Sequence, residues 1–207
     1  MIDRCIFCDL ERERSEGHVL YESLNFYVEP VLFGAFAPGH VLLISKFHIR
    51  CFGDMPENYR QEFLSVLDMT RRKVEDAFSP PFFSEMGVYG QSVKHAHLHL
   101  FPSITEQYHI TSLISHIPED VITSEIAGLA ELAEIYHKEG EYITIYENGQ
   151  LYACHTKGYQ GEAIRLRDLF VKVTGLTEFL NWQTMPQELQ TKNREWSDHT
   201  KRVFKQQ

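Results

Sequence analysis

Residues 90–101 read Gly90-Gln91-Ser92-Val93-Lys94-His95-Ala96-His97-Leu98-His99-Leu100-Phe101. Histidines alternate with apolar residues over most of this stretch, which is typical of a β-strand. Side chains two residues apart lie on one face of a strand, so His95, His97 and His99 are predicted to share a face. Imidazole can act as a nucleophile, and its ring N–H can donate to a phosphate, so the array favours phosphoryl chemistry. A merely polar strand face and a metal site are the alternatives.

Short strands and one long helix are predicted on the N-terminal side of this stretch. Residues 19–44 alternate apolar and polar side chains in runs broken by prolines and glycines, as in antiparallel strands joined by turns. Asp54 is predicted to cap a helix that ends near Phe78, because apolar residues recur at helical spacing. Those residues are Tyr59, Phe63, Val66, Thr70 and Val74. The stretch from Phe82 to Phe101 then returns to strand-like alternation.

The C-terminal half has a different pattern. A helical pattern from Ile126 to Tyr136 ends at Gly140, which suits a C-terminal helix cap. Asn148-Gly149 lies between two apolar runs, the strongest short-range signal of a β-hairpin. Two more helices are predicted, at about residues 162–173 and 186–204. The chain therefore combines strands and helices along its whole length.

Composition limits the function classes. Hydrophobic residues make up 43% of the 207-residue chain, enough for a core. The formal net charge is -9, which opposes binding to a nucleic-acid backbone. No run of 18 apolar residues and no signal-peptide pattern occurs. We therefore expect a cytoplasmic protein that binds neither nucleic acid nor membrane.

Cys5 and Cys8 form a C-x-x-C pair near the start of the chain. Two thiolates at this spacing can occupy adjacent corners of a tetrahedral zinc site, which needs two further ligands. A redox pair is the alternative, although no thioredoxin-like βαβ pattern surrounds it. Cys51 and Cys154 stand alone, unlike the cysteines of a secreted disulfide framework.

The segment His-Ala-His-Leu-His-Leu-Phe at residues 95–101 resembles the pattern that names the histidine triad (HIT) family. Gln91-Ser92-Val93 before it, and residues 40–49 upstream with their Lys-x-His-Ile ending, are similar to segments of the family's nucleotide hydrolase and phosphoramidase branch. The resemblance implies an α+β fold, with a half-barrel antiparallel sheet and a long packed helix. It predicts a nucleotide-binding catalytic domain at residues 1–103 and an α/β extension of a hairpin and helices at residues 104–207.

The resemblance also implies catalytic roles. His97 is the expected nucleophile, which forms a covalent nucleotidyl intermediate while a backbone carbonyl orients its other ring nitrogen. His99, Gln91 and Ser92 are the expected donors to the phosphate oxygens. Ser92 is also expected to help protonate the leaving group, with a turn-capping hydroxyl as its alternative role.

By the same resemblance, His48 and His95 complete a zinc site with Cys5 and Cys8. All four positions are then filled by protein, so the Zn²⁺ is expected to be structural and not catalytic. Phe26, Tyr27 and Glu29 are the implied nucleoside contacts, and Glu29 is expected to accept from the ribose hydroxyls. Plain core packing is the alternative for the two aromatic residues.

Lys46 is a further candidate for the phosphates, with a solvated surface lysine as the alternative. Ser84 departs from the family pattern, since it lies near where many relatives place an asparagine that touches the leaving phosphate. The extension is expected either to cover the nucleotide site or to replace the partner surface of dimeric relatives, so a homodimer stays open.

The leading hypothesis is an enzyme that hydrolyses the α-phosphate bond of a purine nucleotide conjugate, either a nucleoside phosphoramidate or a dinucleoside polyphosphate. It would release a nucleoside monophosphate. A nucleotidyl transferase or phosphorylase that uses the same histidine is the first alternative. A non-catalytic, zinc-stabilised nucleotide-binding module is the second.

Overall fold

One eight-stranded sheet forms the centre of the computed structural model, which describes residues 5–8, 19–181 and 184–205. Its strand order is β1-β2-β3-β5-β4-β7-β8-β6, and all neighbouring strands are antiparallel. The bounds are β1 Tyr21–Glu22, β2 Phe26–Pro30, β3 Val41–Ser45, β4 Pro81–Glu85, β5 His97–Pro102, β6 Ile122–Glu125, β7 Ile143–Glu147 and β8 Gln150–His155. With its helices, the sheet confirms the expected α+β class.

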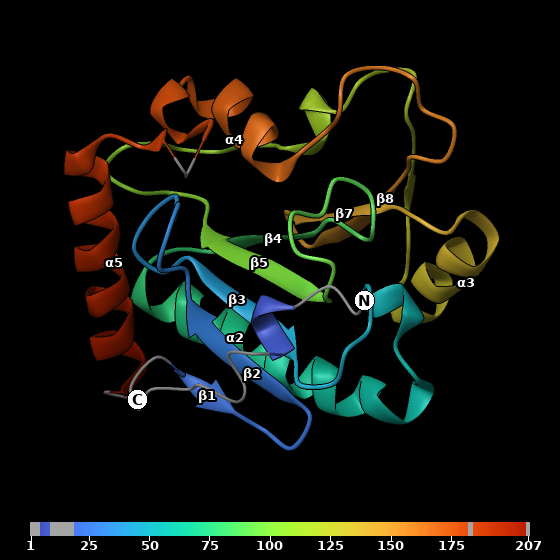
Figure 1. Cartoon of the computed structure of the whole chain (residues 1–207), viewed down its shortest axis with the longest axis horizontal. Coiled ribbons are helices and arrows are strands. Elements are labelled where there is room, and N and C mark those ends of the chain that lie inside the picture. The colour runs from blue at the N-terminus through green and yellow to red at the C-terminus, as the bar shows by residue number, and fades with distance from the viewer. Residues whose placement is uncertain (1–4, 9–18, 182–183, 206–207) are drawn as a thin grey trace.

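Helices pack on both faces of this sheet because alternate residues of β5 point to opposite sides. Leu98 and Leu100 share a core with apolar residues of α2 (Arg60–Ala77). Phe101 shares another core with Leu169 and Phe170 of α4 (Leu166–Thr174). We call this second side, which carries His97, His99 and Phe101, the triad face. Helices α5 (Gln187–Lys205) and α3 (Leu129–Glu139) stand at opposite sides of the molecule (Figure 1).

The segment after Pro102 continues the same sheet. Strand β7 pairs with β4, and the ring of Tyr146 stacks on that of Phe83 at a centroid distance of 3.9 Å. The predicted hairpin β7–β8 is confirmed, with its turn at Asn148 and Gly149, which have φ of 52° and 86°. Gly140 caps α3 with a φ of 84°, as predicted. Strand β6, which the sequence did not indicate, pairs with β8 and ends the sheet.

Helix α2 begins later than the sequence suggested. Asp54 belongs to the 3-10 helix η1 (Phe52–Asp54), a second one, η2 (Glu57–Tyr59), follows, and α2 begins at Arg60. Met55 is extended with a ψ of 128°, because the ring of a proline disfavours the helical conformation in the residue before it. Helix α4 also begins later, at Leu166, after the extended residue Arg165. The buried positions expected on α2 are confirmed except Tyr59, which is half-buried and precedes the helix.

Helix α5 holds a turn from the other end of the chain. The Asn193 amide oxygen accepts the Ala35 N–H at 2.6 Å, across 158 residues of sequence. The Thr200 hydroxyl accepts the Gly39 N–H at 2.8 Å, across 161 residues. Gly39 has a φ of 84°, and a β-carbon there would lie 2.6 Å from the Phe78 ring, so this turn needs glycine. The turn at residues 34–39 is therefore built from both ends of the sequence.

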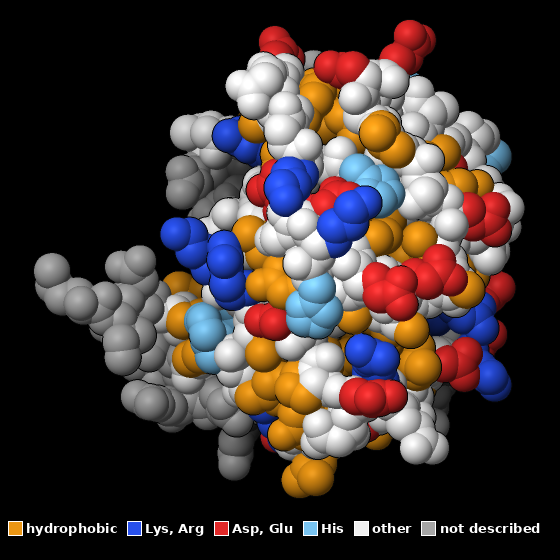
Figure 2. All heavy atoms as spheres, turned by 90° about the vertical axis from the view of Figure 1, so that its right-hand side faces the viewer, with side chains coloured by type: hydrophobic (Ala, Val, Ile, Leu, Met, Phe, Trp, Pro, Cys, Tyr) orange, Lys and Arg blue, Asp and Glu red, His pale blue; other side chains and the backbone are white. Residues whose placement is uncertain are grey.

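The charge distribution on the surface and the character of the helices bear on which kinds of partner the described molecule can bind. On the face that carries α3, lysine and arginine side chains lie among aspartate and glutamate side chains (Figure 2). None of the described helices has both the length and the apolar character needed to cross a membrane.

Candidate active site

His97 is held with one ring nitrogen bonded and the other turned away from that bond. Its Nδ1 lies 2.7 Å from the carbonyl oxygen of His95. A carbonyl can only accept, so Nδ1 carries the proton and Nε2 keeps its lone pair. Burial lowers the pKa of His97 to about 4, although the bond to the His95 carbonyl opposes that shift. His97 is therefore neutral near pH 7, in the tautomer that a nucleophilic Nε2 requires.

His99 is oriented by a chain of hydrogen bonds that begins at a backbone amide. The Phe36 N–H donates to His40 Nδ1 at 3.0 Å, so His40 carries its proton on Nε2. That Nε2 lies 3.0 Å from His99 Nδ1 and donates to it, which leaves His99 protonated on Nε2. Burial, and then the nearby Arg167 cation, lower the pKa of His40 well below its ordinary value. Burial, and then the nearby His97, His40 and Arg167, lower the pKa of His99 well below its ordinary value. We call Phe36, His40 and His99 the tautomer chain.

The two cysteines and two histidines expected to bind zinc meet at one point. The ligand atoms of Cys5, Cys8, His48 and His95 all lie within 4.8 Å of one another. His95 Nδ1 is 3.4 Å from Cys5 Sγ, and His48 Nδ1 is 3.3 Å from Cys8 Sγ. His95 Nε2 donates to the Ser45 carbonyl at 2.7 Å, so its Nδ1 offers a lone pair to the cluster. Two thiols and two imidazoles at these separations fit a tetrahedral zinc site.

Phe7 joins this cluster to His97. Its ring meets the rings of His95 and His97 edge-on, at centroid distances of 5.6 Å and 5.2 Å. It also packs with Tyr27 and Ile44. The short helical segment at residues 6–8 therefore lies beside His97.

The expected nucleoside contacts fall on different sides of the sheet. Tyr27 is buried with Ile44, which pairs with His97, and Glu29 lies on the same side of β2 as Tyr27. Phe26 lies on the opposite side, in the core that also contains Phe63 of α2.

The other expected residues lie at the margins of the site. Lys46 Nζ bonds the Ser23 carbonyl and pairs with Glu22, each at 2.6 Å. The Gln91 amide donates to the Arg50 carbonyl at 2.7 Å, and Ser92 is exposed. Ser84 pairs with His99 across β4 and β5, but its hydroxyl donates to the Thr144 carbonyl at 2.7 Å. The extension therefore already uses the hydroxyl next to His99.

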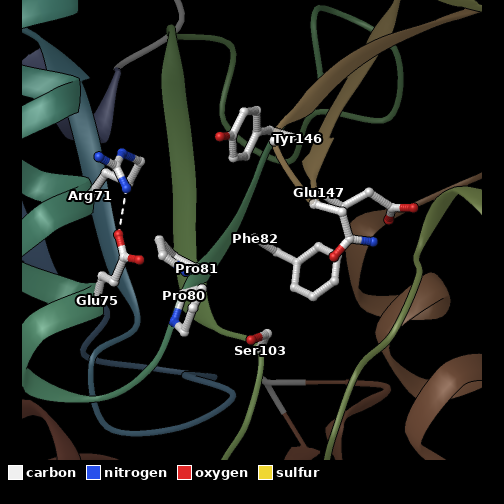
Figure 3. A pocket seen from close by; sticks show the side chains of 10 residues that line it. Arg71, Glu75, Pro80, Pro81, Phe82, Ser103, Tyr146 and Glu147 are labelled. Carbon is white, nitrogen blue, oxygen red and sulfur yellow. Dashed lines mark hydrogen bonds and ion pairs between the residues drawn. The ribbon is translucent and has the colours of Figure 1, made fainter.

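A cavity of about 250 Å³ lies elsewhere in the molecule (Figure 3). It is bounded by the Arg71–Glu75 ion pair of α2, by the start of β4 and by the β7–β8 turn. Its lining includes none of the triad histidines, so it plays no part in the site described here.

Sequence reasoning missed His40, Phe7 and Arg167. The signal for His40 is its register: Leu42, two residues later in β3, pairs with His99, so His40 falls on the triad face beside it. That register needs the pairing of β3 with β5, which local sequence does not provide. Phe7 lies inside the C-x-x-C motif, and Arg167 has no sequence signal at all.

One protein-family model matches part of the chain. Residues 14–106 match the model of the HIT domain. No curated protein matches the chain.

Several solved structures are similar to this chain. A histidine triad nucleotide-binding protein from Sulfolobus tokodaii is 25% identical, with a TM-score of 0.42, over 47% of this chain and 68% of its own. A HIT family hydrolase from Clostridium thermocellum is 25% identical, with a TM-score of 0.43, over 53% of this chain and 99% of its own. A Zn-bound histidine triad family protein from Mycobacterium smegmatis is 23% identical, with a TM-score of 0.42, over 49% of this chain and 76% of its own.

Proposed function

Because residues 14–106 match the model of the HIT domain, we propose that the chain hydrolyses the α-phosphate bond of a purine nucleotide conjugate through a covalent intermediate on His97. The substrate is a nucleoside phosphoramidate or a dinucleoside polyphosphate. The product is a nucleoside monophosphate. The observation that carries this proposal is the bond from His97 Nδ1 to the His95 carbonyl.

The first step uses the lone pair of His97 Nε2. It attacks the α-phosphorus while the bond to the leaving group breaks, and the leaving group departs with its electron pair and takes up a proton. Ser92 is the proposed donor of that proton. A neutral nucleophile suits this step, because protonated Nε2 has no lone pair, and burial keeps the pKa of His97 low, about 4.

The second step regenerates the free enzyme from the covalent intermediate. Water attacks the phosphorus, the phosphorus–nitrogen bond to His97 breaks, and the water proton leaves to solvent or to the group that served as donor. His99, protonated on Nε2, and Gln91 are proposed to donate to the phosphate oxygens in both steps, because charge develops there in the transition state.

Tyr27 and Glu29 are the proposed contacts of the nucleoside. Both lie on the triad side of β2, and Tyr27 packs with Phe7. Glu29 is proposed to accept from the ribose hydroxyls. Phe26 packs in the core on the opposite side of the sheet, and Lys46 pairs with Glu22.

Structural zinc is the second part of the proposal. The ion would be held by Cys5, Cys8, His48 and His95. It would cross-link residues 5–8 to the triad strand and would supply no reactive water. We expect about one zinc per chain by elemental analysis, and far less in Cys8→Ser, while Cys154→Ser keeps it. Equal zinc in both variants would contradict the assignment.

The covalent mechanism is tested by trapping the intermediate. The purified protein is incubated with an adenosine phosphoramidate or a diadenosine polyphosphate and quenched in alkali, and mass spectrometry then locates AMP on the chain. We expect AMP on His97 together with free AMP. His97→Asn should lose both but keep nucleotide binding, and His109→Asn, at an exposed histidine, should behave as wild type.

Other outcomes point to the alternatives. An adduct on His97 without free AMP would indicate a transferase or phosphorylase that lacks its acceptor. Nucleotide binding without adduct or product, in folded and zinc-loaded protein, would indicate a binding module. Equal loss of binding and turnover in His97→Asn would show that His97 serves binding or folding instead.

A further inference from the structure

Helix α4 of the extension reaches the turn that begins the tautomer chain. Arg167, in its first turn, donates to the Gly34 carbonyl and to the Phe179 carbonyl, both at 2.8 Å. Its guanidinium carbon also lies 4.9 Å from the centre of the Phe36 ring. One side chain therefore ties three points together: α4, the chain after it, and the turn after β2.

Phe36 passes this constraint to His40 in two ways. Its N–H donates to His40 Nδ1 at 3.0 Å, and its ring stacks on the His40 ring at 4.7 Å. The same ring stacks on Phe170 of α4 at 4.0 Å with an interplanar angle of 5°. The position of Phe36 therefore depends on α4 both through Arg167 and through Phe170.

His40 decides which nitrogen of His99 carries the proton. A neutral imidazole has one N–H and one lone pair, and a hydrogen bond to one nitrogen fixes the state of the other. With His40 Nε2 donating to His99 Nδ1 at 3.0 Å, His99 can only be a donor through Nε2. If His40 rotated or lost the bond from Phe36, both neutral tautomers of His99 would become populated.

We propose that Arg167 is a positioning residue for the reaction, acting through Phe36 and His40 to keep His99 a hydrogen-bond donor at Nε2. Its catalytic consequence rests on the proposed function, in which His99 donates to the phosphate. The extension thereby contributes to the active site without supplying a group that touches substrate.

The chemistry of arginine fits this role. A guanidinium is planar and has five N–H donors in a fixed fork, so it can serve two carbonyls on separate segments at once. A lysine ammonium is a compact charge on a flexible stem and cannot hold both in the same geometry. Because α5 also holds this turn, through Ala35 and Gly39, loss of Arg167 should loosen Phe36 without unfolding the chain.

The test compares Arg167→Met, Arg167→Lys and Arg165→Met. Arg165 is exposed and two residues away on the same segment, so its replacement removes an equal charge without these contacts. Long-range ¹H–¹⁵N spectra of the histidine rings report which nitrogen is protonated. We expect one protonated nitrogen, Nε2, for His99 in wild type and in Arg165→Met. Arg167→Met should show averaged shifts for both nitrogens, with Arg167→Lys in between.

Turnover gives the second readout. We expect kcat to fall about 10- to 100-fold in Arg167→Met with KM changed less than about twofold, because a displaced donor affects the transition state and not the nucleoside contacts. Wild-type tautomers together with wild-type kcat in Arg167→Met would overturn the inference. So would a change in KM alone, which would place Arg167 in substrate binding.

The controls separate this inference from the proposed function. If wild type releases no AMP from any substrate, the proposed function fails, but the ring-nitrogen shifts still test whether Arg167 sets the tautomer of His99. If Arg167→Met does not fold, the ring-nitrogen shifts of Arg167→Lys test the proposal instead, since this variant keeps the charge and one carbonyl contact. Wild-type ring shifts in folded Arg167→Lys would then contradict the proposal.

Discussion

Glu85 is a buried carboxyl that joins three elements. Its two oxygens accept the Phe52 N–H of η1 at 2.8 Å and the Tyr142 hydroxyl, next to β7, at 2.5 Å. Burial raises its pKa from 4.5 to about 7, against the effect of these bonds. The folded chain therefore binds this proton more tightly than the unfolded chain does. Its stabilising effect is complete below about pH 4.5 and is lost as the pH rises through about 7.

This shift predicts a pH dependence of stability. Between about pH 5 and pH 8, the free energy of unfolding of wild type should fall by about 2.5 kcal/mol relative to that of Glu85→Gln. Denaturant unfolding of both proteins across that range measures the difference. Glu119→Gln, at an exposed carboxylate, should run parallel to wild type. Parallel curves for Glu85→Gln and wild type would show that Glu85 is ionised throughout.

At this scale, local sequence indicated some site residues and not others. The alternation in residues 95–101 indicated which histidines share a side, because strand periodicity depends only on neighbours. His40 could not be found in the same way, since its role depends on a strand pairing across 59 residues. Its proton state depends in turn on the Phe36 amide, which has no side-chain signal.

Among the elements, those with local start and stop signals were predicted well. Gly140 ends α3, and Asn148-Gly149 makes the β7–β8 turn, because both positions need a backbone conformation that few residues accept. The predicted start of α2 at Asp54 was wrong. Pro56 keeps the preceding residue, Met55, extended, and this effect outweighs the tendency of Asp54 to cap a helix. Strand β6 has four residues, three of them exposed, and so lacks the alternation that marks a strand.

The pairing of β7 with β4 is the element-scale result with the widest effect. Phe83, Ser84 and Glu85 pair with Tyr146, Ile145 and Thr144. Because the hairpin takes this edge of β4, that edge is paired within the chain itself. From the sequence, we expected the extension either to cover the nucleotide site or to replace a partner surface. α4 packs on the triad face, and β7 occupies the edge of β4.

For the whole molecule, the core on the triad face crosses the expected boundary at residue 103. Phe36, Phe82 and Phe101 share it with Ile145 and Phe170. Each such buried side chain stabilises the fold by about 2 kcal/mol, and a domain's whole stability is only about 5–15 kcal/mol. The N-terminal segment should therefore not be stable alone.

We expect a chain that ends at Glu106 to lack a cooperative unfolding transition. It would expose the edge of β4 and half of the triad-face core, so we also expect a poorly dispersed amide spectrum and self-association. Thermal unfolding and ¹H–¹⁵N spectra, compared with those of the full chain, test this. A sharp transition in the shortened chain would show that residues 1–106 fold as an independent domain.

The bonds from α5 to the turn at residues 34–39 can form only late in translation. Asn193 and Thr200 are translated more than 150 residues after the amides they hold, those of Ala35 and Gly39. At a typical speed of about 5–20 residues per second, the ribosome needs on the order of 10–30 s to cover that distance. All three triad histidines have been made long before the two bonds from α5 to this turn can form. A nascent or prematurely terminated chain thus contains His97 without the bonds from α5 that hold the turn before His40, and those bonds form only once the last helix has been made.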